Sequence, residues 1–315
     1  MDLTIVIPLY NEEESLPELS QEVERELKES SLKWQLIFID DGSSDNSWGV
    51  IKELSESYPI RGVRFSRNYG KSAALYQGFK LAEGEVVITM DADLQDSPQE
   101  IVPIYQMVKE EGWDVVSGWK KKRYDNLFSK RIPSKIYNSF ASFVTGIKLH
   151  DMNCGLKGYR KEVIKSIELY GEMHRYIPYL SKNAGYGKIG ERVVKHNPRK
   201  YGKSKFGISR FVNGYLDLLS LWFLSKFGKR PMHLFGLAGT LTFILGGSTA
   251  LYLMIEKIVT QAKGLGYRAV TDQPLFYISL VALIIGVQLF LAGFLAELIS
   301  RSSTDRNNYS IREEI

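Results

Sequence analysis

Short apolar runs alternate with amphipathic segments over the first 120 residues of the chain. Runs of apolar and β-branched residues predict strands at 3–8, 35–39, 62–65, 85–90 and 114–117. Between them, apolar residues recur at helical spacing, which predicts helices at 16–27, 73–81 and 99–109. Strands that alternate with helices in this way are typical of a parallel sheet with helices on both faces.

Two long apolar stretches stand near the C-terminus. Residues 232–255 and 274–296 contain no Asp, Glu, Lys or Arg. Each exceeds the roughly 20 residues that a helix needs to cross a bilayer. The pattern therefore predicts a two-helix transmembrane hairpin over residues 231–298, with spans at about 232–255 and 274–297. Basic residues gather at the outer ends of this hairpin, which favours a cytoplasmic catalytic part.

Charge is distributed unevenly along the chain. Residues 1–100 hold 20 acidic and 9 basic side chains, whereas the remainder holds 16 acidic and 32 basic ones. An acidic half joined to a basic half argues against nucleic acid as a partner and indicates that one end meets a polyanionic surface. Basic and aromatic residues before the first span predict an amphipathic helix in the membrane interface, with a helix packed on the domain as the alternative. The single cysteine, Cys154, fits a reducing compartment.

Two carboxylates, Asp91 and Asp93, directly follow the predicted strand at 85–90. Ligands bind open α/β sheets beyond the carboxyl ends of the strands. Spaced by one residue, with the amide of Gln95 beyond, these side chains are oxygen ligands that suit Mg²⁺ or Mn²⁺. A cation there would stabilise a diphosphate leaving group. For this motif by itself, a solvated acidic turn is the alternative.

The other predicted strands also end in polar clusters, at residues 8–12, 40–45 and 67–71. One crevice at the strand ends would then receive an aromatic ring, several carboxylates, basic residues and a metal site. A tyrosine ring can stack on a base, a carboxylate can accept hydrogen bonds from a base or a ribose, and a cation can hold a diphosphate. This set of groups fits a nucleoside diphosphate that carries a sugar.

The motifs PLYNE, DDGSSD, RNYGK, DADLQD and GKSKF resemble those of glycosyltransferase family 2 enzymes with a GT-A fold. The match is to membrane-anchored polyisoprenyl-phosphate glycosyltransferases of the dolichol-phosphate mannose synthase type. This resemblance implies an α/β, Rossmann-like GT-A domain that binds a nucleotide sugar over residues 1–207. It further implies a juxtamembrane helix at 208–230, the hairpin at 231–298 and a cytoplasmic tail at 299–315.

The resemblance implies the roles of individual site residues, and for Asp91, Asp93 and Gln95 it agrees with the metal site that the strand-end pattern predicts. Those predicted to be catalytic and to hold the metal are Asp91, Asp93 and Gln95. Those predicted to bind the nucleotide sugar are Pro8, Tyr10, Asn11, Glu12, Ile39, Asp41, Lys71, Asp91, Ala92, Asp93, Arg199 and Lys205. Those predicted to bind the acceptor phosphate are Lys120, Lys130, Ser134 and Lys203. Segments 151–155 and 171–175 resemble elements on the sugar or acceptor side.

The resemblance implies the inverting transfer of one sugar from a nucleoside-diphosphate sugar to undecaprenyl or dolichyl phosphate, at the cytoplasmic face of the plasma (inner) membrane. A phosphomonoester has a second pKa of roughly 6, so the acceptor needs no strong general base. The alternatives are a processive polysaccharide synthase, which would need more spans, and a noncatalytic membrane scaffold that binds nucleotides. The sequence does not specify the sugar, the nucleotide of the donor (UDP or GDP) or the polyprenol. It also leaves the oligomeric state open, and a homo-oligomer is one possibility.

Overall fold

The computed structural model describes residues 1–121, 141–142, 144–198, 200–201, 216, 219–220, 222–223, 226–228, 230–266 and 268–302. The chain forms two compact units, residues 1–220 and 221–315, each of which is considered by itself. The predicted boundary at residue 207 and the predicted helix at 208–230 lie mostly outside the described residues. Both stay predictions.

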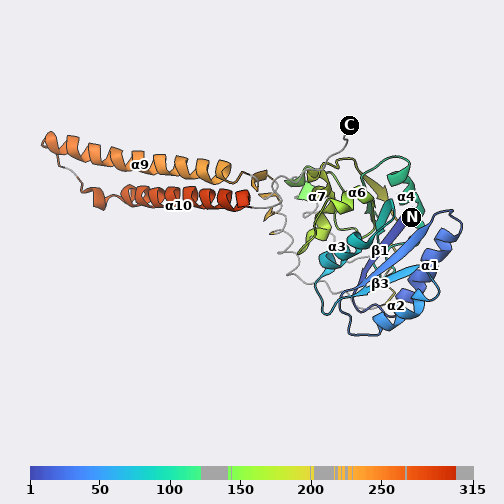
Figure 1. Cartoon of the computed structure of the whole chain (residues 1–315). Helices are drawn as coiled ribbons and strands as arrows, with labels where there is room; N and C mark the ends of the chain where they lie inside the picture. Colours follow the sequence, from blue (N-terminus) through green and yellow to red (C-terminus); the bar gives the residue numbers. More distant parts are fainter. Residues whose placement is uncertain are drawn as a thin grey trace. The chain divides into compact units, whose positions relative to one another are not determined.

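A seven-stranded mixed sheet with the order β3-β2-β1-β4-β6-β5-β7 forms the centre of the first unit (Figure 1). Strands β1 to β4 are parallel, so that Ile5 of β1 lies opposite Leu36 of β2 and Ile88 of β4. The five predicted strands are confirmed, with ends that differ by one or two residues. The strands are β1 (Leu3–Leu9), β2 (Trp34–Asp40), β3 (Ile60–Arg64), β4 (Val86–Thr89), β5 (Val115–Trp119), β6 (Lys157–Arg160) and β7 (Ile189–Val193).

Strand β6 runs antiparallel to both of its neighbours, β4 and β5. The prediction of a parallel sheet is therefore wrong for this strand. To run parallel to its neighbours, β6 would have to be preceded by a crossover that returns the chain to the amino ends of the strands. Instead, the segment before β6 lies at the carboxyl ends of its neighbours, where Thr89 Oγ1 donates to Gly155 O (2.8 Å) and Gly118 N donates to Leu156 O (2.9 Å). Because β6 enters the sheet from that edge, residues 151–156 are placed beside the end of β4.

Helices cover both faces of the sheet. Helix α1 contacts α2 and α4, while α3 contacts α6. The helices predicted at 16–27, 73–81 and 99–109 are confirmed as α1, α3 and α4. Helices α2, α6 and α7 were not predicted. The helices are α1 (Leu16–Lys28), α2 (Ser47–Ser55), α3 (Lys71–Leu81), α4 (Ile101–Lys109), α6 (Lys161–Lys165) and α7 (Ile177–Asn183).

The two faces of β1 pack against different helices because successive side chains of a strand point to opposite sides. Ile5 and Ile7 are buried in the same cluster as Leu16 and Leu19 of α1. On the other face, a Cβ atom on Gly78 of α3 would lie 2.3 Å from Val6 Cγ1. Glycine at this position lets α3 approach β1, and so holds the N-terminus of α3 near the strand ends.

The second unit contains two long apolar helices, α9 (Met232–Ala262) and α10 (Pro274–Ser302), which lie side by side as a hairpin (Figure 1). A Cβ atom on Gly239 would lie 2.7 Å from Gly286 O, so glycine permits close backbone packing there. Outward-facing apolar side chains such as Leu245 and Ile278 are exposed (67% and 63%). Among the described residues, these two helices are long and apolar enough to cross a membrane. Both predicted spans fall within them, and α9 continues past residue 255.

Candidate functional site

The parallel strands β2, β1 and β4 end side by side and carry most of the predicted site residues. The chain proceeds from β1 to β2 on one side, while β4 lies on the other side of β1. The strand order therefore reverses between β1 and β4, which is where open α/β sheets form a ligand crevice. Pro8 lies within β1 and Ile39 within β2, while Asp91 and Asp93 come directly after β4.

The loops after β1 and β2 hold each other in place through hydrogen bonds. Asn11 N donates to Ser43 Oγ (2.9 Å), and Ser44 N donates to Asn11 Oδ1 (2.8 Å). Glu12 N donates to Ser47 Oγ at the start of α2 (3.0 Å). Asn11 has a φ of 55°, a left-handed backbone that asparagine tolerates better than most residues. These contacts bring the predicted nucleoside residues of both loops together.

Asp41 ties the loop after β3 to the same edge. Its carboxylate accepts hydrogen bonds from Tyr69 N (2.7 Å) and Gly70 N (2.9 Å). Burial raises the pKa of Asp41, although the two backbone N–H groups favour the charged form and oppose this. Because Lys71 directly follows Gly70 and begins α3, Asp41 also fixes where the Lys71 side chain starts.

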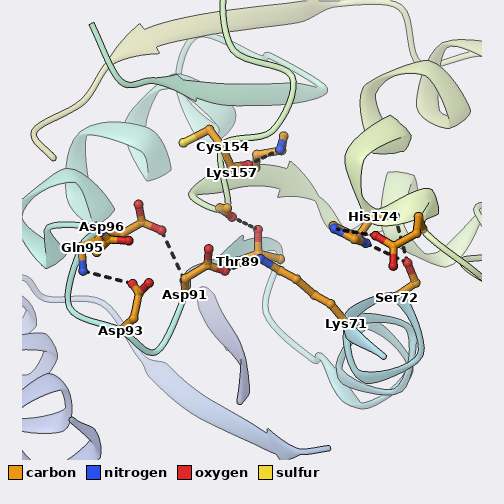
Figure 2. A network of polar contacts seen from close by, with 12 residues as sticks. Lys71, Ser72, Thr89, Asp91, Asp93, Gln95, Asp96, Cys154, Lys157 and His174 are labelled. Carbon is orange, nitrogen blue, oxygen red and sulfur yellow. Dashed lines mark hydrogen bonds and ion pairs between the residues drawn. The ribbon is translucent and has the colours of Figure 1, made fainter. Parts of the chain in front are cut away.

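Asp91, just beyond the end of β4, is paired with a residue of opposite charge. Its carboxylate forms an ion pair with Lys71 Nζ (Figure 2). Burial opposes ionisation of Asp91, but the ammonium groups of Lys71 and Lys120 outweigh it and hold the pKa of Asp91 well below its usual range. A Cβ atom on Gly155 would lie 2.5 Å from Asp91 Oδ2. Only a glycine at position 155 therefore leaves room for the carboxylate in this position.

The loop from Asp91 to Asp96 is closed by its own carboxylates. Asp96 Oδ2 accepts a hydrogen bond from Asp91 N (3.3 Å), and Asp93 Oδ1 accepts one from Gln95 N (3.1 Å) (Figure 2). Between them, Leu94 has a φ of 59° and a side chain that is 7% exposed. The buried leucine holds the loop to the core while the flanking polar side chains remain at the strand ends.

Lys120 lies beneath this loop in an ion pair with Asp96, at 2.7 Å between Nζ and Oδ1. Burial disfavours its charge, yet Asp96 more than compensates and raises the pKa of Lys120 above its usual range. Lys120 thus supports the loop that carries Asp91. Its predicted role toward the acceptor phosphate stays a prediction.

The donor atoms of Asp91, Asp93 and Gln95 fit a hard divalent cation. Two carboxylates and an amide carbonyl offer oxygen ligands only, and Mg²⁺ or Mn²⁺ commonly completes such a set with water or phosphate oxygens. The ammonium of Lys71 already provides a positive charge against Asp91. Across the ranges that the structure describes, no group of three or more His, Cys, Asp or Glu side chains could hold a metal ion. Any cation here would therefore share its coordination with a ligand.

Next to Asp91 lies a small pocket whose lining includes Lys71 and Gly155, both of which lie close to the Asp91 carboxylate. Its lining comes from elements that are far apart in the sequence: Lys71, Leu75, Thr89, Asn153, Cys154, Gly155, Lys157, Tyr159, His174, Arg175 and Ile177. Lys71, Thr89, Cys154, Lys157 and His174 of this lining are labelled in Figure 2. Both segments that resemble sugar- or acceptor-side elements, 151–155 and 171–175, contribute to it.

His174 closes one side of the pocket as a neutral imidazole. Burial, followed by the positive charges of Lys71 and Arg175, holds the pKa of His174 well below its usual range. Ser72 Oγ accepts a hydrogen bond from His174 N (3.0 Å) and lies 3.0 Å from His174 Nδ1, to which its hydroxyl can donate. His174 is therefore anchored to the first turn of α3, next to Lys71.

The structure brings the predicted residues of both strand-end loops together with Lys71, Asp91 and Asp93. Lys130, Ser134, Arg199, Lys203 and Lys205 lie outside the described residues, so their predicted roles are untested. Sequence reasoning did not single out Ser72, Asp96 or Lys157. The sequence offers no local signal for Lys157, because β6 reads Lys-Gly-Tyr-Arg and has no apolar run that would mark it as a buried strand.

Comparison with known proteins extends over the whole chain. Residues 4–168 match the sequence model of Glycosyl transferase family 2. The dodecaprenyl-phosphate galacturonate synthase of Rhizobium johnstonii is 36% identical over 319 aligned positions, which cover 99% of this chain and 93% of that protein. The undecaprenyl-phosphate 4-deoxy-4-formamido-L-arabinose transferase of Proteus mirabilis is 33% identical, with 99% and 94% covered. The similarity thus includes the hairpin.

Solved structures share the fold of the first unit. Mannosyl-3-phosphoglycerate synthase from Rubrobacter xylanophilus has a TM-score of 0.59 at 15% identity and covers 72% of this chain and 75% of that chain. Glucosyl-3-phosphoglycerate synthase from Mycobacterium tuberculosis, in complex with Mn²⁺, uridine diphosphate and glucosyl-3-phosphoglycerate, has a TM-score of 0.55 at 16% identity, with 71% and 79% covered. At these identities the likeness shows the fold alone.

Proposed function

Because the chain belongs to glycosyltransferase family 2, we propose that it transfers a single sugar from a nucleoside-diphosphate sugar to a polyprenyl phosphate, with inversion. The predicted α/β, Rossmann-like GT-A fold of the first unit is confirmed. The observation that carries the proposal is that both named relatives, whose names contain a polyprenyl phosphate, match the donor unit and the hairpin together. The two relatives are named for different sugars, galacturonate and 4-deoxy-4-formamido-L-arabinose.

Two alternatives are less well supported. A processive polysaccharide synthase would need further spans to form a channel for its polymer, whereas the described part of the chain offers two helices of membrane-spanning length. A noncatalytic scaffold would have no need for a carboxylate pair at a strand end. Asp91 is instead held in place by Lys71 and Gly155, as a reacting site requires.

The nucleotide sugar binds across the ends of β1, β2 and β4. The nucleoside meets the loops of Tyr10 and Asp41, and the diphosphate meets Asp91 and Asp93. Lys71 turns from Asp91 to a diphosphate oxygen when the donor binds, a movement that is supported by the partial exposure of its side chain (29%). A Mg²⁺ or Mn²⁺ ion held by Asp91, Asp93 and Gln95 would neutralise charge on the departing nucleoside diphosphate.

The acceptor phosphate requires positioning rather than deprotonation. Its second pKa is roughly 6, so it is largely a dianion near neutral pH. We assign its binding to the basic residues Lys130 and Lys203 with Ser134, which lie outside the described residues. Arg199 and Lys205 belong to the same proposal, on the donor side. Holding an anionic oxygen in line with the anomeric carbon then supplies most of the rate enhancement that the acceptor side can provide.

Inversion is the stereochemical test of this function. The product should be a polyprenyl-phosphate monosaccharide whose anomeric configuration is opposite to that of the donor, because one displacement by an anionic oxygen needs no covalent glycosyl-enzyme. The measurement is the anomeric proton signal of the purified product by NMR. Retention of configuration, or a trapped glycosyl-protein adduct, would contradict a single displacement.

The hairpin anchors the catalytic unit on the cytoplasmic side of the plasma (inner) membrane. We expect a cysteine introduced at the exposed position Glu53 to react with an impermeant maleimide only after the membrane is permeabilised. A cysteine introduced at Lys263, between α9 and α10, should react in intact cells. Native Cys154 will not interfere, because it is buried and burial raises the pKa of its thiol to about 12. The reverse labelling pattern would overturn the orientation.

A further inference from the structure

The pocket beside Asp91 is unusually rich in positive charge. Three cationic side chains line it, those of Lys71, Lys157 and Arg175. None of the described residues in its lining is an aspartate or a glutamate. Neutral sugars are commonly held by side chains that accept hydrogen bonds from hydroxyl groups. This pocket instead offers mainly donors, so it suits a ligand that brings its own acceptors.

Two of these cations already have anionic partners. Lys71 pairs with Asp91, and Arg175 Nη2 lies 3.0 Å from Glu172 Oε2. The third, Lys157, is 3% exposed and donates to the main-chain oxygens of Met152 (3.2 Å) and Cys154. No carboxylate among the described residues forms an ion pair with it. Lys157 is therefore a buried ammonium without a direct ion pair, and the carboxylates of Asp151 and Asp91 offset only part of the cost of its burial.

A buried charge of this kind is unfavourable until a counter-ion arrives. Removal from water lowers the pKa of Lys157, which reflects the same imbalance. An ammonium has three N–H donors, and two of them are directed to backbone carbonyls. Among the described residues the third N–H has no acceptor, and Lys157 lines the pocket.

The position of the pocket identifies the part of the donor that enters it. Asp93 and Gln95 lie on one side of Asp91, while Lys71, Ser72 and His174 lie on the other (Figure 2). A diphosphate held at Asp91 and Asp93 would therefore direct its sugar toward Lys71 and the pocket. Thr89 and Gly155, which adjoin Asp91, are themselves part of the pocket lining.

We infer that this pocket receives a carboxylate on the donor sugar, so that the donor is a nucleoside-diphosphate uronic acid. The inference rests on the proposed function and names its substrate class. The carboxylate balances the charge of Lys157 and accepts hydrogen bonds from the donors of the lining. A neutral hexose in the same place leaves Lys157 without a direct ion pair.

The test compares matched donors with the full-length chain in lipid nanodiscs that contain undecaprenyl phosphate. The pairs are UDP-galacturonate with UDP-galactose, UDP-glucuronate with UDP-glucose, and GDP-mannuronate with GDP-mannose. For at least one pair, kcat/KM for the uronate should exceed that for the neutral sugar by about tenfold or more, as a hydrogen bond to a buried charge implies. Equal or better transfer of the neutral member in every pair that is used would overturn the inference.

Lys157→Met tests the residue itself, because methionine has a similar length without the charge. The variant should lose about tenfold to a hundredfold in kcat/KM for the uronate and change about threefold or less for the neutral partner. Lys161→Met is the matched control, since Lys161 is a surface lysine that donates to Glu83 O (3.1 Å). If Lys157→Met does not fold, as judged by its melting curve, the donor comparison with the unaltered chain still decides.

Binding of the nucleoside diphosphate without a sugar separates the possible failures. UDP and GDP should bind Lys157→Met and the unaltered chain equally well by calorimetry. If Lys157→Met weakens UDP or GDP binding by the same factor as it lowers kcat/KM for the uronate, Lys157 contacts the diphosphate and the inference is wrong. Absence of lipid-linked product with every donor would refute the proposed function as well. Efficient transfer of neutral sugars alone would refute only the uronate assignment.

Discussion

Replacing Asp93 with asparagine should lower the rate of sugar transfer by about a thousandfold, which corresponds to about 4 kcal/mol of transition-state stabilisation. Asparagine keeps an oxygen that can accept the hydrogen bond from Gln95 N (3.1 Å), so the loop should retain its shape. What is lost is the negative charge that a divalent cation and the diphosphate require. Transfer is measured as radiolabelled sugar that enters the lipid fraction, together with the melting temperature of the variant.

Chelation should reproduce the effect of Asp93→Asn without changing the protein. EDTA should abolish transfer by the unaltered enzyme, and added Mg²⁺ or Mn²⁺ should restore it. Glu53→Gln, which removes an exposed carboxylate on α2, is the matched control and should have full activity. If Asp93→Asn retains full activity in the presence of chelator, the proposal of a cation at this strand end is wrong.

The second large effect is expected at Gly155, which has no functional group. Alanine at this position would place its Cβ atom 2.5 Å from Oδ2 and 2.6 Å from Oδ1 of Asp91. The Asp91 carboxylate would have to move, and a displacement of about 1 Å at a reacting centre can lower the rate on the order of a hundredfold. We therefore expect Gly155→Ala to lower kcat by at least this factor, as measured by steady-state transfer.

The fold should survive this change better than the activity. Overpacking at one buried site costs about 1–3 kcal/mol, which lowers the melting temperature without preventing folding. Gly187→Ala is the matched control, because nothing lies within 4 Å of its Cβ position. Normal kcat in Gly155→Ala would mean that the observed position of Asp91 is not the one required for transfer.

Much of the first unit follows from local sequence patterns. The parallel strands β1, β2 and β4 are short and mainly apolar runs, and the carboxylates that follow them are visible as motifs. Both C-terminal helices are visible because long stretches without charge are rare outside membranes. These features depend on neighbouring residues, so a single sequence is sufficient to predict them.

The missing parts depend on contacts between distant segments. The direction of β6 is set by where its preceding loop lies, and Gly155 meets Asp91 across 64 positions of sequence. No local periodicity reports such a contact. Lys120 illustrates the same limit, because the sequence shows a basic run whereas the structure places this one member in an ion pair with Asp96.

Leu94 links the chemistry of the strand-end loop to the packing of the core. Its left-handed backbone, with a φ of 59°, costs about 1–2 kcal/mol for a residue with a side chain. Burial of the leucine side chain, which contributes roughly 2 kcal/mol, offsets this strain. The loop that presents Asp91 and Asp93 therefore keeps its shape only while the core beneath Leu94 is well packed. Local unfolding around Leu94 would abolish activity in molecules whose sheet is still folded. Activity is therefore expected to be lost under milder conditions than the fold.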